Sequence, residues 1–398
     1  MLINLNNPTT KPVTGVALLQ LGFRPFFLLA GVSAALLVLF WGFVFQTGSG
    51  HMAYTPVSWH GHEMVFGYTA AVVAGFLLTA AKNWTGKQTL NGPALLLLAL
   101  LWSAGRIGSL MAGSIPLWLI SLIDLSFIPA LALAVAVPVV QTKNYRNLVF
   151  IGILLAYSTA NGLFHLGANG MFDAGETTGV YLGLYTLLML ISVMGGRVIP
   201  FFIERGLHNG FKASTRKSVE TLAQVLLIAF ALLFVADTKG GLPATVALAT
   251  AAMHAIRLTG WYHKGIWRVQ LLWVLVTAYG WIVIGLFLMA PALLGLLNPM
   301  LAVHAMTTGG IGLITAGMMV RVSMGHSGRQ LHAPNSLVLA FVLLNLAAIT
   351  RVFVPMLLPD HYADTVFLSA MLWATAFMIF TARMAPIFWL PRVDGRPG

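Results

Sequence analysis

The sequence contains no cysteine and very little charge. Charged side chains make up 8% of its 398 residues and apolar side chains 59%, whereas a soluble domain has about 25% charged residues. The lack of cysteine excludes disulfides, thiolate-ligated iron–sulfur clusters and thiolate catalysis, so any metal must use histidine, methionine, carboxylate or backbone ligands. The scarcity of charge excludes an ordinary soluble domain and predicts an integral membrane protein.

The formal net charge of +12 does not indicate a nucleic-acid partner. The basic residues lie in short segments between long apolar runs, where membrane proteins commonly carry them. We see no internal repeat, soluble domain or low-complexity tail. We therefore expect one integral membrane domain over residues 1–398, surrounded by lipid. The first apolar run follows a mildly polar segment without a signal-peptide cleavage pattern, so we expect it to be a retained helix.

Twelve runs are long and apolar enough to cross a bilayer, which requires about 20 residues each. They predict an all-α, polytopic membrane helix bundle. The expected spans are 24–46, 58–81, 93–111, 116–140, 147–168, 178–203, 219–236, 241–259, 269–290, 298–320, 335–357 and 363–385.

The basic residues of the connecting segments support this count. With twelve spans, nearly all loop lysines and arginines fall on the face that also holds both termini, and the opposite face has only Lys239. The positive-inside rule then places both termini in the cytoplasm. A miscount by one span would destroy the alternation of charge between the two faces.

The residues W-H-G-H-E-M-V-F-G at 59–67 open the second span and carry the clearest functional signal. His60, His62 and Glu63 lie at the outer mouth of a membrane helix, where ionisable groups are costly and functional by default. Residues two apart on a helix point about 200° apart, so His60 and His62 either flank a non-helical turn or serve different centres. Glu63 is suited to orienting a histidine, relaying protons or ligating a metal, and its simplest role is to complement the helix dipole.

Two further histidines are expected at a similar outer depth. His165 lies near the outer end of the fifth span, and His304 lies about 9 Å into the tenth. Helix bundles build metal and cofactor sites from side chains on separate helices. We therefore predict a haem or metal site that uses His60, His62, His165 and His304, against the alternative that each ring only hydrogen-bonds to a neighbour. Met64 is the one methionine that we would test as a soft ligand.

Three arginines and one aspartate also lie inside the expected spans. Arg106 and Asp124 occupy the outer halves of neighbouring spans, which favours an ion pair between them. A sharper alternative assigns Arg106 or Arg351 to the propionates of a haem, because a guanidinium binds a carboxylate with two hydrogen bonds. Arg197 lies near the inner end of the sixth span and either serves a cofactor or extends to the membrane surface.

Five long motifs resemble those of the NnrS family across nearly the whole chain. They are F-R-P-F-F-L at 23–28, W-H-G-H-E-M-V-F-G at 59–67, G-F-L-L-T-A-A-K-N-W-T-G at 75–86, G-G-R-V-I-P at 195–200, and the run from His304 to G-H-S-G-R at 325–329. The resemblance implies a twelve-helix protein of the bacterial inner (cytoplasmic) membrane that carries haem and copper. It also implies a role in nitric oxide metabolism, including denitrification, or in resistance to nitrosative stress.

The resemblance extends to individual residues. His60, His62 and Glu63 match the family's paired-histidine motif, and His165 matches a histidine that ends its fifth helix. The remaining matches are His304, Arg321, His326, Arg329, Arg106 and Arg197. Residues 271–280 depart from the pattern because they lack a histidine that members often carry there, which puts one ligand in doubt.

These signals favour an oxidoreductase of the nitric oxide reductase type. In this hypothesis two nitric oxide molecules, two electrons and two protons give nitrous oxide and water, and a quinol or a cytochrome donates the electrons. The cofactors would be a b-type haem and copper, and Glu63 would be the catalytic residue that moves protons. Two alternatives stay open: a haem or metal protein that binds or buffers nitric oxide without turnover, and a twelve-helix transporter for metal or haem.

Overall fold

The structure is a computed structural model that describes residues 16–111 and 113–395. Among these residues, twelve helical segments are long and apolar enough to cross a membrane, which confirms the predicted all-α bundle of twelve spans. Helices are expected because backbone groups in hydrocarbon have no water to bond and must pair within their own segment.

The spans are built from fifteen α-helices and several short 3₁₀ and π segments. The first six spans contain α1 (Phe23–Thr47), α2 (Pro56–His62), η2 (Glu63–Tyr68), α3 (Thr69–Thr85), α4 (Gly92–Ser109), α5 (Leu117–Gln141), η3 (Tyr145–Asn147), α6 (Leu148–Ala168) and α7 (Gly175–Leu207). The last six contain α8 (Lys217–Val235), α9 (Gly241–Trp261), α10 (Gln270–Leu293), α11 (Pro299–His304), η5 (Ala305–Ile311), α12 (Gly312–His326), α13 (Asn335–Val352), α14 (Val354–Leu357), η6 (Pro359–His361) and α15 (Tyr362–Trp389).

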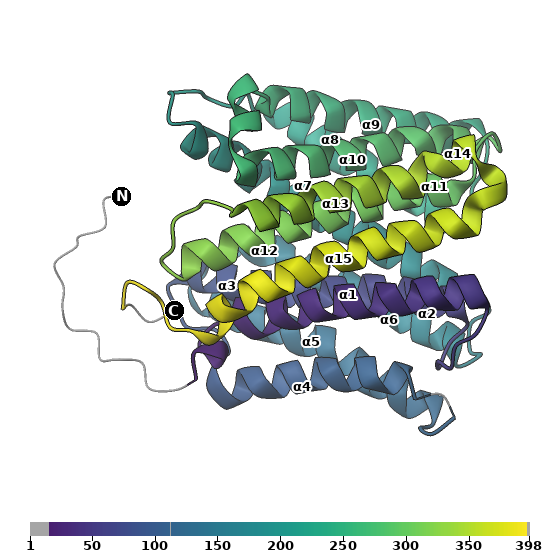
Figure 1. Cartoon of the computed structure of the whole chain (residues 1–398), viewed down its shortest axis with the longest axis horizontal. Coiled ribbons are helices and arrows are strands. Elements are labelled where there is room, and N and C mark those ends of the chain that lie inside the picture. The colour runs from purple at the N-terminus through teal and green to yellow at the C-terminus, as the bar shows by residue number, and fades with distance from the viewer. Residues whose placement is uncertain (1–15, 112, 396–398) are drawn as a thin grey trace.

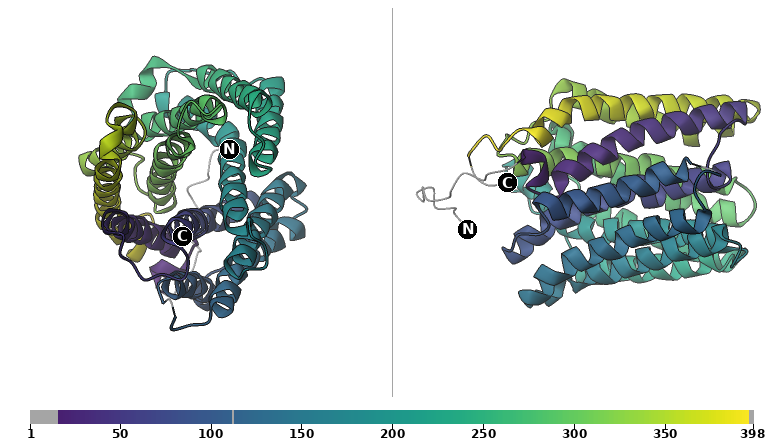
Figure 2. Two further views of the ribbon diagram at one scale, coloured as in Figure 1. Left: turned by 90° about the vertical axis from the view of Figure 1, so that its right-hand side faces the viewer. Right: turned by 90° about the horizontal axis from the view of Figure 1, so that it is seen from below.

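The helices run along one common axis (Figure 1). Helix α1 begins and α15 ends at the same end of the bundle, and α2, α11 and α14 lie at the other end. Seen end-on, the helices are arranged around a central axis (Figure 2). Their buried apolar side chains form one continuous cluster that draws on helices from α1 to α15.

The second and tenth spans are the most enclosed of the twelve. Buried residues make up 83% of the most apolar part of the second span and 78% of that of the tenth, whereas the value for α8 is only 17%. The apolar surface of α8 is therefore available to lipid, and the spans that carry His60, His62 and His304 lie inside the bundle. This placement brings their polar groups together instead of exposing them to hydrocarbon.

The two inner spans share an irregularity that hydropathy did not predict. Each begins with a proline at the first helical turn, capped by the preceding side chain: Thr55 accepts from the backbone N–H of Ser58 at 3.4 Å, and Asn298 accepts from that of Met300 at 2.9 Å. Each then continues through a π-helical segment, η2 directly after His62 and η5 directly after His304. Such segments within α-helices are frequent at functional sites because they re-aim side chains.

The absence of cysteine makes the topology directly testable. We expect Lys239→Cys, between α8 and α9, to react with a membrane-impermeant maleimide in intact spheroplasts, and Lys212→Cys, between α7 and α8, to react only after lysis. One span separates these two loops, so they lie on opposite faces of the membrane. Cytoplasmic termini then put the loop between α8 and α9 outside. The cysteine-free parent provides the blank, and labelling of Lys212→Cys alone before lysis would invert the assignment.

Candidate functional site

The enclosed spans line a cavity of about 320 Å³, which we call the central pocket. Its wall is formed by α1, α2, η2, the start of α3, α7, α11, η5, α13 and α15, so segments from both halves of the chain contribute. The lining is mainly apolar, with a few polar side chains among aromatic and aliphatic ones. This volume and composition are typical of a small-molecule or cofactor site.

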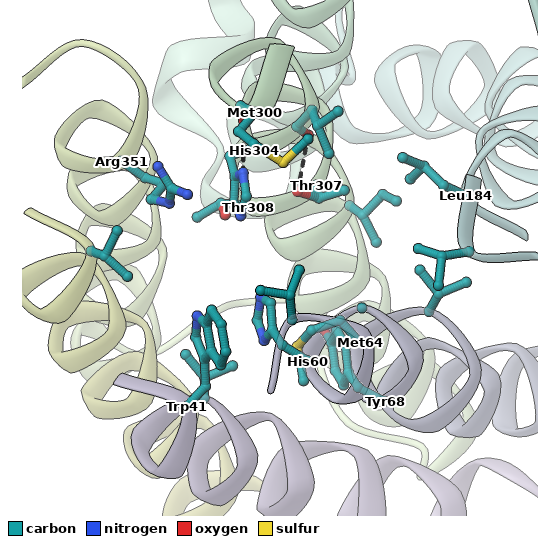
Figure 3. Close-up of a pocket in the computed structure, with 18 of the residues that line it drawn as sticks. Trp41, His60, Met64, Tyr68, Leu184, Met300, His304, Thr307, Thr308 and Arg351 are labelled. Atoms are coloured by element: carbon teal, nitrogen blue, oxygen red, sulfur yellow. Dashed lines mark hydrogen bonds between the residues drawn. The ribbon is translucent and has the colours of Figure 1, made fainter. Parts of the chain in front are cut away.

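His60 and His304 lie on opposite walls of the central pocket (Figure 3). Nδ1 of His304 lies 2.7 Å from the carbonyl oxygen of Met300, to which it donates. This bond keeps the proton on Nδ1 and leaves Nε2 with a free lone pair, which is the arrangement of a metal-binding histidine. The ring of His60 stacks on Trp41 with centroids 4.3 Å apart, and its buried Nδ1 has no hydrogen-bond partner in the described part of the chain.

Arg351 supplies a positive charge to the same pocket. Its Nη2 donates to the hydroxyl of Tyr362 at 2.9 Å, and its buried Nη1 has no hydrogen-bond partner among the described residues. No carboxylate forms a salt bridge with Arg351 within residues 16–111 and 113–395. A guanidinium enclosed without a counter-ion is costly, so this position suits a ligand that brings a negative charge.

The mouth of the central pocket lies at the end of the bundle where α2 and α7 begin. Val57 on α2 is 69% exposed although it lines the pocket, and Thr177 on α7 is exposed as well. The hydroxyl of Ser58 donates to the carboxylate of Glu176 across this mouth. The opening therefore has a hydroxyl and a carboxylate beside it.

His62 and His165 lie elsewhere, in a buried group that we call the ion network: His62, Glu63, Arg106, Asp124 and His165. Arg106 forms an ion pair with Asp124 and places its Nε 3.1 Å from Oε2 of Glu63, a contact that is electrostatic rather than an aligned hydrogen bond. Oδ2 of Asp124 lies 3.0 Å from Nε2 of His165 and 3.2 Å from Nε2 of His62. Nδ1 of His62 completes the network at 3.3 Å from Oε1 of Glu63.

The four predicted histidines thus separate into two pairs. His60 and His304 face the central pocket, and His62 and His165 face Asp124. The separation of His60 from His62 follows the helix geometry that puts residues two apart on nearly opposite faces. Glu63 turns with His62 into the ion network and does not line the pocket.

Close approach of helices builds the ion network. A Cβ on Gly67 would lie 2.9 Å from both Nη1 of Arg106 and Oε2 of Glu63, and one on Gly105 would lie 2.8 Å from Oδ1 of Asp124. Glycine at these two positions lets the Arg106 guanidinium and the Asp124 carboxylate lie directly against the helix backbones. Larger residues there would separate the charges.

The ion network also contains a group of possible metal ligands. His62, Asp124 and His165 each offer a ligand atom, and these atoms lie within 4.8 Å of one another. Their set of two imidazoles and one carboxylate suits a transition metal. The same atoms are already paired with each other and with Arg106, so a metal would have to replace existing interactions.

The arginines also have distinct positions. Arg106 makes the predicted ion pair, and this explains its buried position without a propionate. Arg197 donates to Oδ1 of Asn147 at 3.1 Å and lies over the ring of Phe150. It is roughly 30 Å along α7 from Glu176, so it belongs neither to the central pocket nor to the ion network.

Some residues of these sites carried no strong sequence signal. Asn161 donates to Oδ2 of Asp124 at 2.9 Å. It lies four residues before His165 on α6, and this spacing, which puts both side chains on one helix face, could have identified Asn161 as a site residue. Tyr54 packs against His62, and its buried hydroxyl has no hydrogen-bond partner in the part of the chain that the structure describes. Burial, with the carboxylates of Asp124 and Glu63, raises the pKa of Tyr54 above its ordinary value, so the phenol stays protonated. Nothing in the local sequence around Tyr54 or Trp41 indicates these contacts.

The ion network should be essential to stability. We expect Asp124→Asn to lower the free energy of unfolding by about 3–5 kcal/mol, because Arg106 would keep a buried charge without its main partner. The exposed pair between Lys212 and Glu204 offers the control, since removing it with Lys212→Ala should leave stability unchanged. Thermal unfolding of the purified protein in detergent measures both, and equal behaviour of the two variants would contradict the assignment.

Comparison with known proteins assigns the chain to a family. The family model described as "NnrS protein" matches residues 17–392, which is nearly the whole chain. No curated protein gives a match. The matched region includes every residue of the central pocket and of the ion network. The chain, with its twelve candidate membrane spans, therefore belongs to the NnrS family.

Proposed function

We propose that this chain binds haem in the central pocket and reduces nitric oxide to nitrous oxide there. The observation that carries the proposal is the pair of histidines on opposite walls, beside a buried arginine. Within the described part of the chain, each histidine has a ring nitrogen without a protein partner and the arginine has no counter-ion. Membership of the NnrS family supports a haem- or metal-binding role. We place the protein in the bacterial inner membrane, with the mouth of the pocket toward the periplasm.

His304 is the residue that we assign to the haem iron. The hydrogen bond from its Nδ1 to the carbonyl of Met300 orients the ring and raises the basicity of Nε2. Because the chain has no cysteine, covalent attachment through thioether bonds is impossible. The haem is therefore held by ligation and packing, as a b-type haem is.

Arg351 and Tyr362 are the groups that we assign to the propionates. Their mutual hydrogen bond holds the guanidinium against the pocket wall, and the free Nη1 is available to a carboxylate. Arg106 has no such capacity because Asp124 and Glu63 already neutralise it. The proposal therefore selects Arg351 from the two candidates that the sequence offered.

His60 is the residue that we assign to copper. Its Nδ1 has no partner among the described residues and its side chain lines the cavity, and Met64 follows one helical turn later beside it (Figure 3). Imidazole with thioether is a donor set suited to copper, particularly in its reduced state. His62 and His165 are assigned to positioning, since Nε2 of each ring already faces Oδ2 of Asp124.

Bound haem and copper would supply the redox chemistry, in which two nitric oxide molecules, two electrons and two protons give nitrous oxide and water. A quinol or a cytochrome is the proposed electron donor.

Glu176 and Ser58 line the polar mouth through which protons and water would pass. Glu63 lies outside the pocket, so we assign it the task of holding η2 through Arg106 and His62.

The ligand assignment predicts unequal effects of four histidine substitutions. His304→Ala should abolish the haem absorbance of the purified protein, and His60→Ala should remove copper while keeping most of the haem. His62→Ala and His165→Ala should retain both groups in whatever fraction remains folded. His361→Ala, an exposed histidine at the same end of the bundle, is the control. Metal loss in His62→Ala and His165→Ala, with His60→Ala unaffected, would move the copper to the group around Asp124.

Turnover is tested separately from binding. We expect nitric oxide consumption, with nitrous oxide formed in a ratio of two to one, when the loaded wild-type protein receives a quinol analogue or an artificial donor. Arg351→Ala should lower haem occupancy, and Arg351→Lys should restore part of it because the charge returns without the planar fork. A protein with normal haem and copper that binds nitric oxide without consuming it would be a buffering protein, and the catalytic proposal would be wrong.

A further inference from the structure

A second cavity of about 80 Å³, which we call the inner chamber, adjoins the central pocket. It lies deeper in the bundle, among α1, α3, α7 and α12. Thr69, Leu187 and Ile311 line both cavities. These three residues therefore form the boundary between the pocket and the chamber.

The wall of the inner chamber offers almost nothing to water. Among the described residues, Thr69 and Thr315 are its only polar side chains, and both hydroxyls are engaged by helix carbonyls. Thr69 donates to the carbonyl of Met64 at 2.8 Å, and Thr315 donates to that of Ile311 at 2.6 Å. A buried water needs two to four polar partners, and apolar cavities of this kind stay dry and take up apolar guests.

We propose that the inner chamber is a binding site for small neutral gas molecules, which it stores beside the central pocket and exchanges with it. This inference rests on the proposed function, because it assigns nitric oxide and its product to the chamber. The volume admits a diatomic or linear triatomic molecule and excludes a quinol or a haem. An ion or a proton would lose its hydration there without gaining a partner, so the chamber admits neutral species only.

The two cavities then give protons and water one route and neutral gas molecules another. Glu176 and Ser58 give the central pocket a polar mouth at the end of the bundle. The chamber extends from the opposite side of the pocket, past Val73 and Ile314, through apolar wall. Protons and water therefore use the mouth, and the gas uses the chamber.

Xenon is a direct probe of the chamber that needs neither haem nor turnover. Crystals of the wild-type protein pressurised with xenon should show an anomalous peak among Val73, Leu187 and Ile314. Val73→Phe should remove this peak because the added ring fills the chamber. Val225→Phe is the matched control, since Val225 is 53% exposed on α8, whereas Val73 is 7% exposed. Ordered water in the chamber, or no xenon in the wild-type protein, would overturn the proposal.

Ligand kinetics test whether the chamber serves the pocket. In the reduced, haem-loaded protein, Val73→Phe should slow carbon monoxide rebinding after flash photolysis by about tenfold, and Val225→Phe should leave it unchanged. Equal rates in both variants would overturn the exchange between chamber and pocket. A chain that binds no haem would contradict the proposed function instead, and the xenon peak alone would then decide whether the chamber is a gas site.

Discussion

A polar group inside a membrane protein must be paired within the protein, because the surrounding hydrocarbon offers no hydrogen bonds. In this chain Arg106 provides the central pairing. Its guanidinium neutralises Asp124 and contacts Glu63, and its Nη1 also donates to the carbonyl of Phe66 at 2.9 Å. That carbonyl belongs to η2, whose π-helical turns do not pair like those of an α-helix. One cation therefore joins α4 and α5 to the irregular turn that begins directly after His62.

This anchoring explains why the two histidines of one motif have different tasks. The hydroxyl of Tyr157 donates to the carbonyl of Val65, and Trp102 donates to that of Gly67 at 3.0 Å. The irregular turn is thus held from the side of the ion network, and the opposite side of the same helix is left to the pocket. Both ring nitrogens of His62 have protein partners, whereas Nδ1 of His60 has none among the described residues, and this contrast separates the two histidines of the motif.

The sequence was sufficient for some features and insufficient for others, for physical reasons. Twelve spans could be predicted because hydropathy is averaged over about 20 residues and tolerates local errors. The common depth of His60 and His304 followed from counting along helices, but their facing positions depend on helix rotation, which η2 and η5 alter. The stacking of Trp41 on His60 and the hydrogen bond between Arg351 and Tyr362 join different helices, so no local sequence pattern predicts these contacts.

The hydrocarbon that forces the chain into helices also bears on the proposed chemistry. Nitric oxide is neutral and partitions into lipid, so this proposed substrate would be available on every side of the bundle, whereas protons are available only at its ends. A site near one end, with polar Glu176 at its mouth and apolar Leu187 at its inner boundary, has access to both. A site at the centre of the membrane would need a hydrated proton path through the span. The position of His60 and His304 near one end of the bundle removes that requirement, which is a physical reason for proposing a proton-consuming reaction there.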